Sequence, residues 1–257
     1  MIFDTHCHLY DDRYENSDEI IKSCIEQGVT LMMIPGDNIA NSIKAVNLAN
    51  KYQEIYAAVG IHPEEIESIS LKEGIEELRK LVSSSNKIKA IGEIGLDKHW
   101  IKDEVTISKQ KEYFIEQIKL ANELHLPIIV HARDADGETF DILRKYKPLY
   151  GCVLHCFSGS VELMKEYVKM GFYIGIDGPV TYKNSVTPKE VARLLPLENM
   201  VIETDSPYLP PVPHRGENNY PYYLKIILDK ISEIRGIVSR EIEYTTYNNG
   251  KRLFRID

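Results

Sequence analysis

Two histidines separated by one residue, His6 and His8, stand close to the N-terminus. They follow a short apolar run, residues 2–5, that is typical of a β-strand. Because side chains alternate between the two faces of a strand, both imidazoles leave one face and Cys7 leaves the other. Two neutral imidazoles on one face provide half of the ligands of a first-row metal site. Ordinary strand ends also carry such pairs, so the metal interpretation depends on further ligands elsewhere in the chain.

Histidines and carboxylates also follow several other apolar runs. Nitrogen and oxygen donors of this kind suit Zn²⁺, Mn²⁺ or similar ions. Six donors are too many for one tetrahedral Zn²⁺ that keeps an open position, but they suit two ions about 3.5–4 Å apart that share a carboxylate. The six candidate ligands are His6, His8, Glu93, His131, His155 and Asp205.

We therefore predict a site for two divalent ions, with Glu93 as the carboxylate that bridges them. One ion would be completed by His6, His8 and Asp205, and the other by His131 with His155. Such ions lower the pKa of a bound water and polarise the scissile group, and Asp205 is the expected acceptor of the proton of that water. Salt bridges at the strand ends are the alternative role for Glu93 and Asp205. The ligand types do not distinguish Zn²⁺, Mn²⁺, Mg²⁺ and Ni²⁺.

Elements that bring these donors to one place can be predicted from the apolar pattern. Eight short apolar runs, nearly continuous in Val, Ile, Leu, Ala and Tyr, alternate with segments of helical period. This pattern predicts an α/β fold, a (β/α)8 TIM barrel whose active site lies at the C-terminal ends of the strands. A doubly wound open sheet is the alternative, but the first βα turn lacks a Gly-rich dinucleotide fingerprint. The strands are predicted at residues 2–5, 29–34, 55–59, 89–92, 127–130, 152–154, 172–176 and 200–203.

Helix signals fill the intervals between these runs. Ser17 and Ser160 are predicted N-caps, and Gly28 and Gly171 are the corresponding stops. The Pro-rich segment 209–220 is predicted to be a long loop after the last strand, where long loops are usually functional. Further helices are predicted at residues 106–125, 222–235 and 241–252.

Length, charge and cysteine content limit the class of protein. A chain of 257 residues without a linker-like segment predicts one domain, residues 1–257. The net charge of −8 argues against a broad basic surface for non-specific DNA binding, although bound divalent ions can reverse the local charge of a site. The four cysteines have no CxxC spacing, and no apolar run has the length of a membrane span. We expect a cytoplasmic protein with free thiols, no signal peptide, no membrane association and no obligate protein partner.

The motifs at the predicted strand ends resemble those of the TatD family of metal-dependent hydrolases, a branch of the amidohydrolase superfamily. The resemblance runs from end to end of the chain, and it extends to weaker positions at Gln110 and Asn249. The matching stretches are DTHCH at 4–8, GIHP at 60–63, GEIGLD at 92–97, HAR at 131–133, HCFSGS at 155–160, ETDSPYL at 203–209 and VPHRG at 212–216.

This resemblance implies a two-metal phosphodiesterase, typically a DNase of 3′→5′ exonuclease type. The implied substrate is nucleic acid, DNA as a single strand or a 3′ end. The resemblance assigns the six ligands named above and adds four residues that line the substrate site. An Arg fork fits phosphate oxygens, and a Tyr can stack or donate a hydrogen bond. The four added residues are His62, Arg133, Tyr208 and Arg215.

Three positions depart from the family pattern, and at one of them Ala132 stands where a Ser is frequent. Lys98 stands where an aromatic residue is frequent, and Glu217 stands where a Lys is frequent, so that a positive contact to phosphate is lost. Two of the added residues also have alternative roles that involve no substrate. Arg133 could pair with a neighbouring carboxylate, and Arg215 could be an exposed loop charge.

Other functions stay open at this point. An esterase or amide hydrolase of the same superfamily, or a deacylase of the D-aminoacyl-tRNA type, could use the same metal ligands. A catalytically silent binding protein is the alternative from another class. The complete set of six ligands argues against it, since a silent relative would be free to lose ligands.

Overall fold

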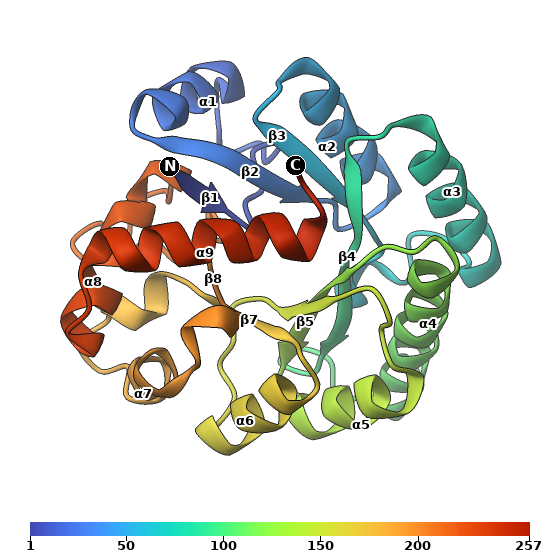
Figure 1. Cartoon of the computed structure of the whole chain (residues 1–257). Coiled ribbons are helices and arrows are strands. Elements are labelled where there is room, and N and C mark those ends of the chain that lie inside the picture. Colours follow the sequence, from blue (N-terminus) through green and yellow to red (C-terminus); the bar gives the residue numbers. More distant parts are fainter. The chain divides into compact units, whose positions relative to one another are not determined.

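The computed structural model describes all 257 residues, and eight of its segments are β-strands (Figure 1). The strands form one parallel sheet in which the order in space follows the order in the sequence. Helices alternate with the strands, so the predicted (β/α)8 TIM-barrel class is confirmed. The strands are β1 (Ile2–Asp4), β2 (Val29–Pro35), β3 (Ile55–Val59), β4 (Ile88–Asp97), β5 (Ile128–Arg133), β6 (Cys152–Leu154), β7 (Tyr173–Ile176) and β8 (Met200–Ile202).

Nine α-helices and four short 3₁₀ turns connect the strands. No helix combines the length and the apolar character that crossing a bilayer requires. The helices are α1 (Ser17–Glu26), α2 (Ile39–Lys51), α3 (Leu71–Ser84), α4 (Glu104–Glu123), α5 (Asp136–Tyr146), α6 (Val161–Lys169), α7 (Thr187–Leu194), α8 (Leu224–Arg235) and α9 (Ser239–Phe254). The 3₁₀ turns are η1 (Pro63–Glu65), η2 (Gly178–Thr181), η3 (Leu197–Asn199) and η4 (Pro221–Tyr223).

One of the two predicted helix caps is confirmed and the other is wrong. Ser160 caps α6, because its hydroxyl accepts a hydrogen bond from the backbone N–H of Leu163. At α1 the cap is Asn16, whose side-chain oxygen accepts from two backbone N–H groups of the first turn. The hydroxyl of Ser17 donates instead to the carbonyl of Leu9, at 2.6 Å.

Internal contacts divide the chain into two units. The first unit comprises Met1–Ile34 and His155–Asp257, and the second comprises Pro35–Leu154. The expectation of one domain over residues 1–257 stays a prediction.

In the first unit, the last helix packs on the first and last strands. Helix α9, red in Figure 1, lies against β1 and β8. A Cβ at Gly250 would come within 2.6 Å of the ring of Phe3, so this glycine permits the close approach of helix and strand. The buried amide of Asn249 donates to the carbonyls of Leu197 and Met200, at 2.8 and 2.7 Å. These contacts fix β1 and the start of β8 against the last helix.

In the second unit, α4 plays the matching role on β4, which it covers in Figure 1. The fully buried amide of Gln110 accepts from the backbone N–H of Asp97 at 3.1 Å and donates to its carbonyl at 3.0 Å. The amide of Gln117 likewise accepts from the backbone N–H of Ile61 and donates to its carbonyl. Gln110 and Asn249, which match weaker family positions, therefore hold strand ends in place.

The predicted end of β4 at residue 92 is wrong, because the strand continues to Asp97. Its register against β5 shifts between Ile91 and Ile94, and Gly95 then pairs with His131. Gly95 has a φ of 150°, and a Cβ there would collide with the carbonyl oxygen of His131. Glycine thus allows β4 to run past Glu93, which lies within the strand.

Candidate metal centre

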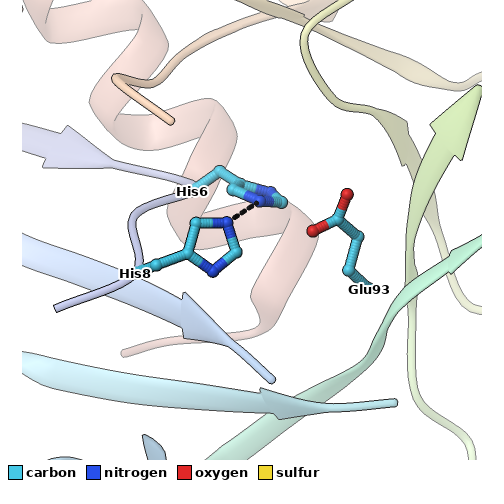
Figure 2. A group of neighbouring side chains, drawn as sticks. All are labelled: His6, His8 and Glu93. Atoms are coloured by element: carbon cyan, nitrogen blue, oxygen red, sulfur yellow. Dashed lines mark hydrogen bonds between the residues drawn. The ribbon is translucent and has the colours of Figure 1, made fainter. Parts of the chain in front are cut away.

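Four of the predicted ligands come together in the first unit. The Nε2 atoms of His6 and His8 lie 3.1 Å apart, and Figure 2 shows the two imidazoles side by side. Oδ1 of Asp205 lies 3.6 Å from Nε2 of His6 and 3.4 Å from Nε2 of His8. The ring of His155 stacks on that of His6, with centroids 4.0 Å apart. We refer to His6, His8, His155 and Asp205 as the first donor set.

The backbone around this set is held by a buried carboxylate that the sequence analysis did not single out. Asp4 accepts hydrogen bonds from the backbone N–H of His6 at 3.2 Å and of Thr204 at 3.0 Å, and from the hydroxyl of Thr204 at 2.6 Å. The backbone N–H of Asp205 donates to the carbonyl of His6. Asp4 therefore ties the end of β1 to the segment after β8, and burial raises the pKa of its carboxyl to about 7.

A second buried acid lies behind the first donor set. Glu203 is fully buried, and it accepts from the backbone N–H of Cys156 at 2.5 Å and from the hydroxyl of Thr5 at 3.2 Å. Burial raises its pKa well above the usual value. Oε1 of Glu203 is 3.9 Å from Nδ1 of His155, so the acid supports the segment that carries this imidazole.

The pKa of Asp205 is shifted in the opposite direction to that of Glu203. Burial raises the pKa of its carboxyl, but the hydrogen bond from His8 and the neighbouring imidazoles outweigh this, so that the pKa lies below its usual value. Its side chain is 14% exposed. Asp205 is thus an ionised carboxylate that remains accessible, as a metal ligand or a proton acceptor must be.

The second unit holds another compact group. Nδ1 of His131 lies 3.0 Å from Oε1 of Glu93, and Nε2 of His62 lies 3.6 Å from the same oxygen. The rings of His62 and His131 meet edge to face, with centroids 4.4 Å apart. Nε2 of His131 lies 2.9 Å from Oδ2 of Asp97. We refer to His62, Glu93 and His131 as the second donor set, with Asp97 behind it.

The charges within the second set reinforce one another. Burial lowers the pKa of His131, but its hydrogen bonds to Asp97 and Glu93 outweigh this and raise the pKa to about 9. For Asp97 burial raises the pKa, and the hydrogen bond with His131 brings it below its usual value. The imidazole is therefore held between two carboxylates, with one nitrogen directed at each.

Both sets fit a divalent ion by their chemistry. One ligand atom each from His6, His155 and Asp205 lies within 4.8 Å of the others, and the same holds for His62, Glu93 and His131. Imidazole nitrogens with carboxylate oxygens are the ligands that Zn²⁺ and Mn²⁺ accept. Metal-binding histidines usually give their second nitrogen to a carboxylate, as His131 does to Asp97. His155 lies in the first set and His131 in the second, and the division of the six ligands between two ions stays a prediction.

The four residues predicted to line a substrate site have different surroundings. His62 accepts a hydrogen bond from the backbone N–H of Glu64 and belongs to the second donor set. The hydroxyl of Tyr208 donates to Asp11 at 3.2 Å, and the guanidinium of Arg13 lies 4.3 Å from its ring centre. The ring of Tyr208 is 40% exposed.

Arg133 and Arg215 are exposed, and each lies over an aromatic ring. The guanidinium of Arg133 is 5.9 Å from the ring centre of Trp100, and that of Arg215 is 4.0 Å from the ring centre of Tyr182. Neither guanidinium forms an ion pair with a carboxylate, so both cations remain available to an anion.

The departures from the family pattern at Lys98 and Glu217 form local ion pairs. Lys98 pairs with Glu138 on α5, which also pairs with Lys111 on α4. Glu217 accepts from Nδ1 of His214 at 2.9 Å. The negative charge of Glu217 is therefore directed at a neighbour of Arg215.

Asp97, Asp4 and Glu203 are the functional candidates that the sequence analysis missed. Asp97 could have been found from periodicity, because it lies four residues after Glu93 along β4 and so on the same face. Asp4 and Glu203 carry no such signal. Their roles depend on contacts between segments about 200 residues apart.

The fold and the donor sets define a metal-dependent hydrolase on a (β/α)8 scaffold, and comparison with known proteins agrees. The model of the TatD related DNase family matches residues 3–255. The metal-dependent hydrolase YabD of Bacillus subtilis is 40% identical over 259 residues, which cover 100% of both chains. The metal-dependent hydrolase YcfH of Escherichia coli is 33% identical, over 100% of this chain and 97% of its own. The chain belongs to the TatD related DNase family.

Solved structures support the same assignment. YJJV, a TatD homologue from Escherichia coli, superposes with a TM-score of 0.93 at 31% identity, covering 100% of this chain and 98% of its own. A TatD family hydrolase from Entamoeba histolytica superposes with a TM-score of 0.86 at 23% identity, which bears on the fold alone.

Proposed function

We propose that this protein is a DNase that hydrolyses phosphodiester bonds, of 3′→5′ exonuclease type on single-stranded DNA. The observation that carries the proposal is the pair of donor sets, each compact, largely buried and built from imidazoles and a carboxylate. The family to which the chain belongs is described as DNases, which supports the choice of substrate.

The proposal assigns divalent ions to the two donor sets. The ligands would be His6, His8, His155 and Asp205 in the first set, and Glu93 with His131 in the second. Bound divalent ions supply Lewis acidity toward a phosphoryl oxygen and make a water a stronger acid. The carboxylate of Asp205, ionised and partly accessible, accepts the proton of the attacking water.

Three exposed side chains are assigned to the substrate. The guanidinium groups of Arg133 and Arg215 are held over aromatic rings without a carboxylate partner, and they would bind non-bridging phosphate oxygens. The half-exposed ring of Tyr208 would contact a sugar or a base. His62, beside Glu93, would donate to the phosphate that is cleaved.

The proposal also covers the compartment. All four cysteines are free, and three of them are buried. Free thiols are usual in a reducing compartment, so we propose a cytoplasmic location.

A substrate screen with defined metal content tests this function. Chelated protein is reloaded separately with Zn²⁺, Mn²⁺, Mg²⁺ or Ni²⁺ and given single-stranded DNA labelled at one end, RNA, bis-p-nitrophenyl phosphate and D-aminoacyl-tRNA. The expected result is stepwise shortening of DNA from its 3′ end, only in reloaded samples. Deacylation of tRNA without cleavage of DNA would contradict the proposal and identify a deacylase. Binding of DNA without cleavage under every ion would identify a binding protein.

A further inference from the structure

The most exposed aromatic side chain of the second unit lies outside both donor sets. Trp100, the only tryptophan of the chain, is 72% exposed. It lies in the segment between β4 and α4, three residues after Asp97. The indole lies after the end of a strand that carries polar ligands, and its exposed ring offers an aromatic face to a bound molecule.

The segment that carries Trp100 is tied to the second donor set. Asp97 accepts from the backbone N–H of His99 at 2.8 Å through Oδ1, while its Oδ2 lies 2.9 Å from His131. Nδ1 of His99 lies 2.9 Å from Oδ2 of Asp134. The ring of His99 meets that of Trp100 edge to face, with centroids 4.5 Å apart. One carboxylate thus holds both a candidate metal ligand and the base of the tryptophan segment.

The guanidinium of Arg133 lies over the indole of Trp100. Arg133 ends β5 and pairs in register with Asp97 of β4. Its guanidinium lies 5.9 Å from the ring centre of Trp100, and no carboxylate forms an ion pair with it. An exposed aromatic face beside a free cation is the arrangement with which proteins bind single-stranded nucleic acid, stacking a base and neutralising a phosphate.

We propose that Trp100 and Arg133 form a platform for one nucleotide of single-stranded DNA, with the base stacked on the indole and its phosphate at the guanidinium. The platform deepens the proposed function and rests on it for the identity of the strand. Three residues of chain span at most about 10 Å, which is about three base steps at the per-strand rise of B-DNA. The stacked base is therefore within a few nucleotides of a phosphate at the second donor set.

Binding can be measured without cleavage, which separates the platform from the proposed activity. Chelated protein is titrated with short single-stranded oligodeoxyadenylate while the fluorescence of Trp100 is followed. Because the chain has no other tryptophan, the signal reports this position alone. We expect saturable quenching by the single strand and weaker quenching by the same sequence in duplex form, whose base faces are covered.

Variants then measure the contribution of the ring. W100A is expected to weaken binding of fluorescein-labelled single strand, followed by anisotropy, about 5- to 150-fold, the range for loss of one base–aromatic stack. W100F keeps an aromatic face and is expected to restore most of the affinity. Y244A is the matched control, because Tyr244 on α9 is also 72% exposed, and it should bind as the wild type does.

Cleavage assays distinguish the possible failures. In reloaded enzyme, W100A should raise KM for single-stranded DNA with little change in kcat, because the indole is assigned to binding of the strand and not to the bond that is cleaved. Quenching and loss of affinity without any DNA cleavage would retain the platform and overturn the DNase. DNA cleavage with unchanged KM and affinity in W100A would overturn the platform and retain the DNase.

Discussion

Replacing Asp205 with Asn tests the assigned proton acceptor with little change to the backbone. Asp205 has a φ of 55°, in the left-handed region, where Asn is tolerated as well as Asp. Its backbone N–H still donates to the carbonyl of His6. The substitution therefore removes the charge and the basic oxygen while the strand end keeps its conformation.

The expected magnitude follows from the two roles of this carboxylate. Loss of a general base costs about 10²–10⁴ in rate, so kcat on single-stranded DNA should fall by this factor at saturating metal. Loss of a charged ligand should also raise the metal concentration needed for half-maximal activity. At saturating metal, the loss of the proton acceptor still lowers the rate, whereas the weaker binding of metal no longer does.

The assay follows single-turnover release of nucleotides from end-labelled DNA over a wide range of Mn²⁺ concentration. D141N is the control, because Asp141 is an exposed carboxylate on α5 that pairs only with Arg144 of the same helix. It should match the wild type at every concentration. Full recovery of the D205N rate at high Mn²⁺ would refute the proton role, and an unchanged rate at all concentrations would refute both roles.

Three further predictions concern the second donor set and the strand ends. Burial lowers the pKa of His131, but its hydrogen bonds raise that pKa to about 9, so a bound metal must displace a proton from the imidazole. Calorimetry should therefore show an affinity for metal that rises about tenfold per pH unit below that pKa. A metal affinity that stays constant with pH would contradict imidazole ligation. Gly95→Ala forces a Cβ against a carbonyl at positive φ and should lower the free energy of unfolding in urea by about 1–3 kcal/mol; wild-type stability would contradict the close approach. Asn249→Leu leaves the carbonyls of Leu197 and Met200 without a donor and should cost about 1–3 kcal/mol for each, measured by thermal melting, with an unchanged melting temperature as the contrary result.

Much of the fold could be predicted because buried parallel strands have a local signature. Each of the eight apolar runs is a strand, and the Pro-rich segment after β8 is free of strands and α-helices. The extent of β4 could not be predicted in the same way. Gly92 and Gly95 favour a strand end in the sequence, yet here they allow close approach to β5 and the strand continues to Asp97.

Part of the donor sets could also be predicted from the sequence. Period-two alternation places His6 beside His8, and strand ends carry His131 and Asp205. The acids behind the donors were not predictable. Asp4 contacts Thr204, and Glu203 contacts Thr5, so their roles arise only when distant segments meet.

The proposed cleavage of DNA requires divalent metal at the two donor sets. The most direct measurement determines metal content per chain and the rate of DNA shortening in the same samples, as chelated protein is reloaded in steps. We expect no cleavage without metal and a rate that rises with metal content to a plateau near two ions per chain. Undiminished cleavage by protein shown to be free of metal would contradict this requirement.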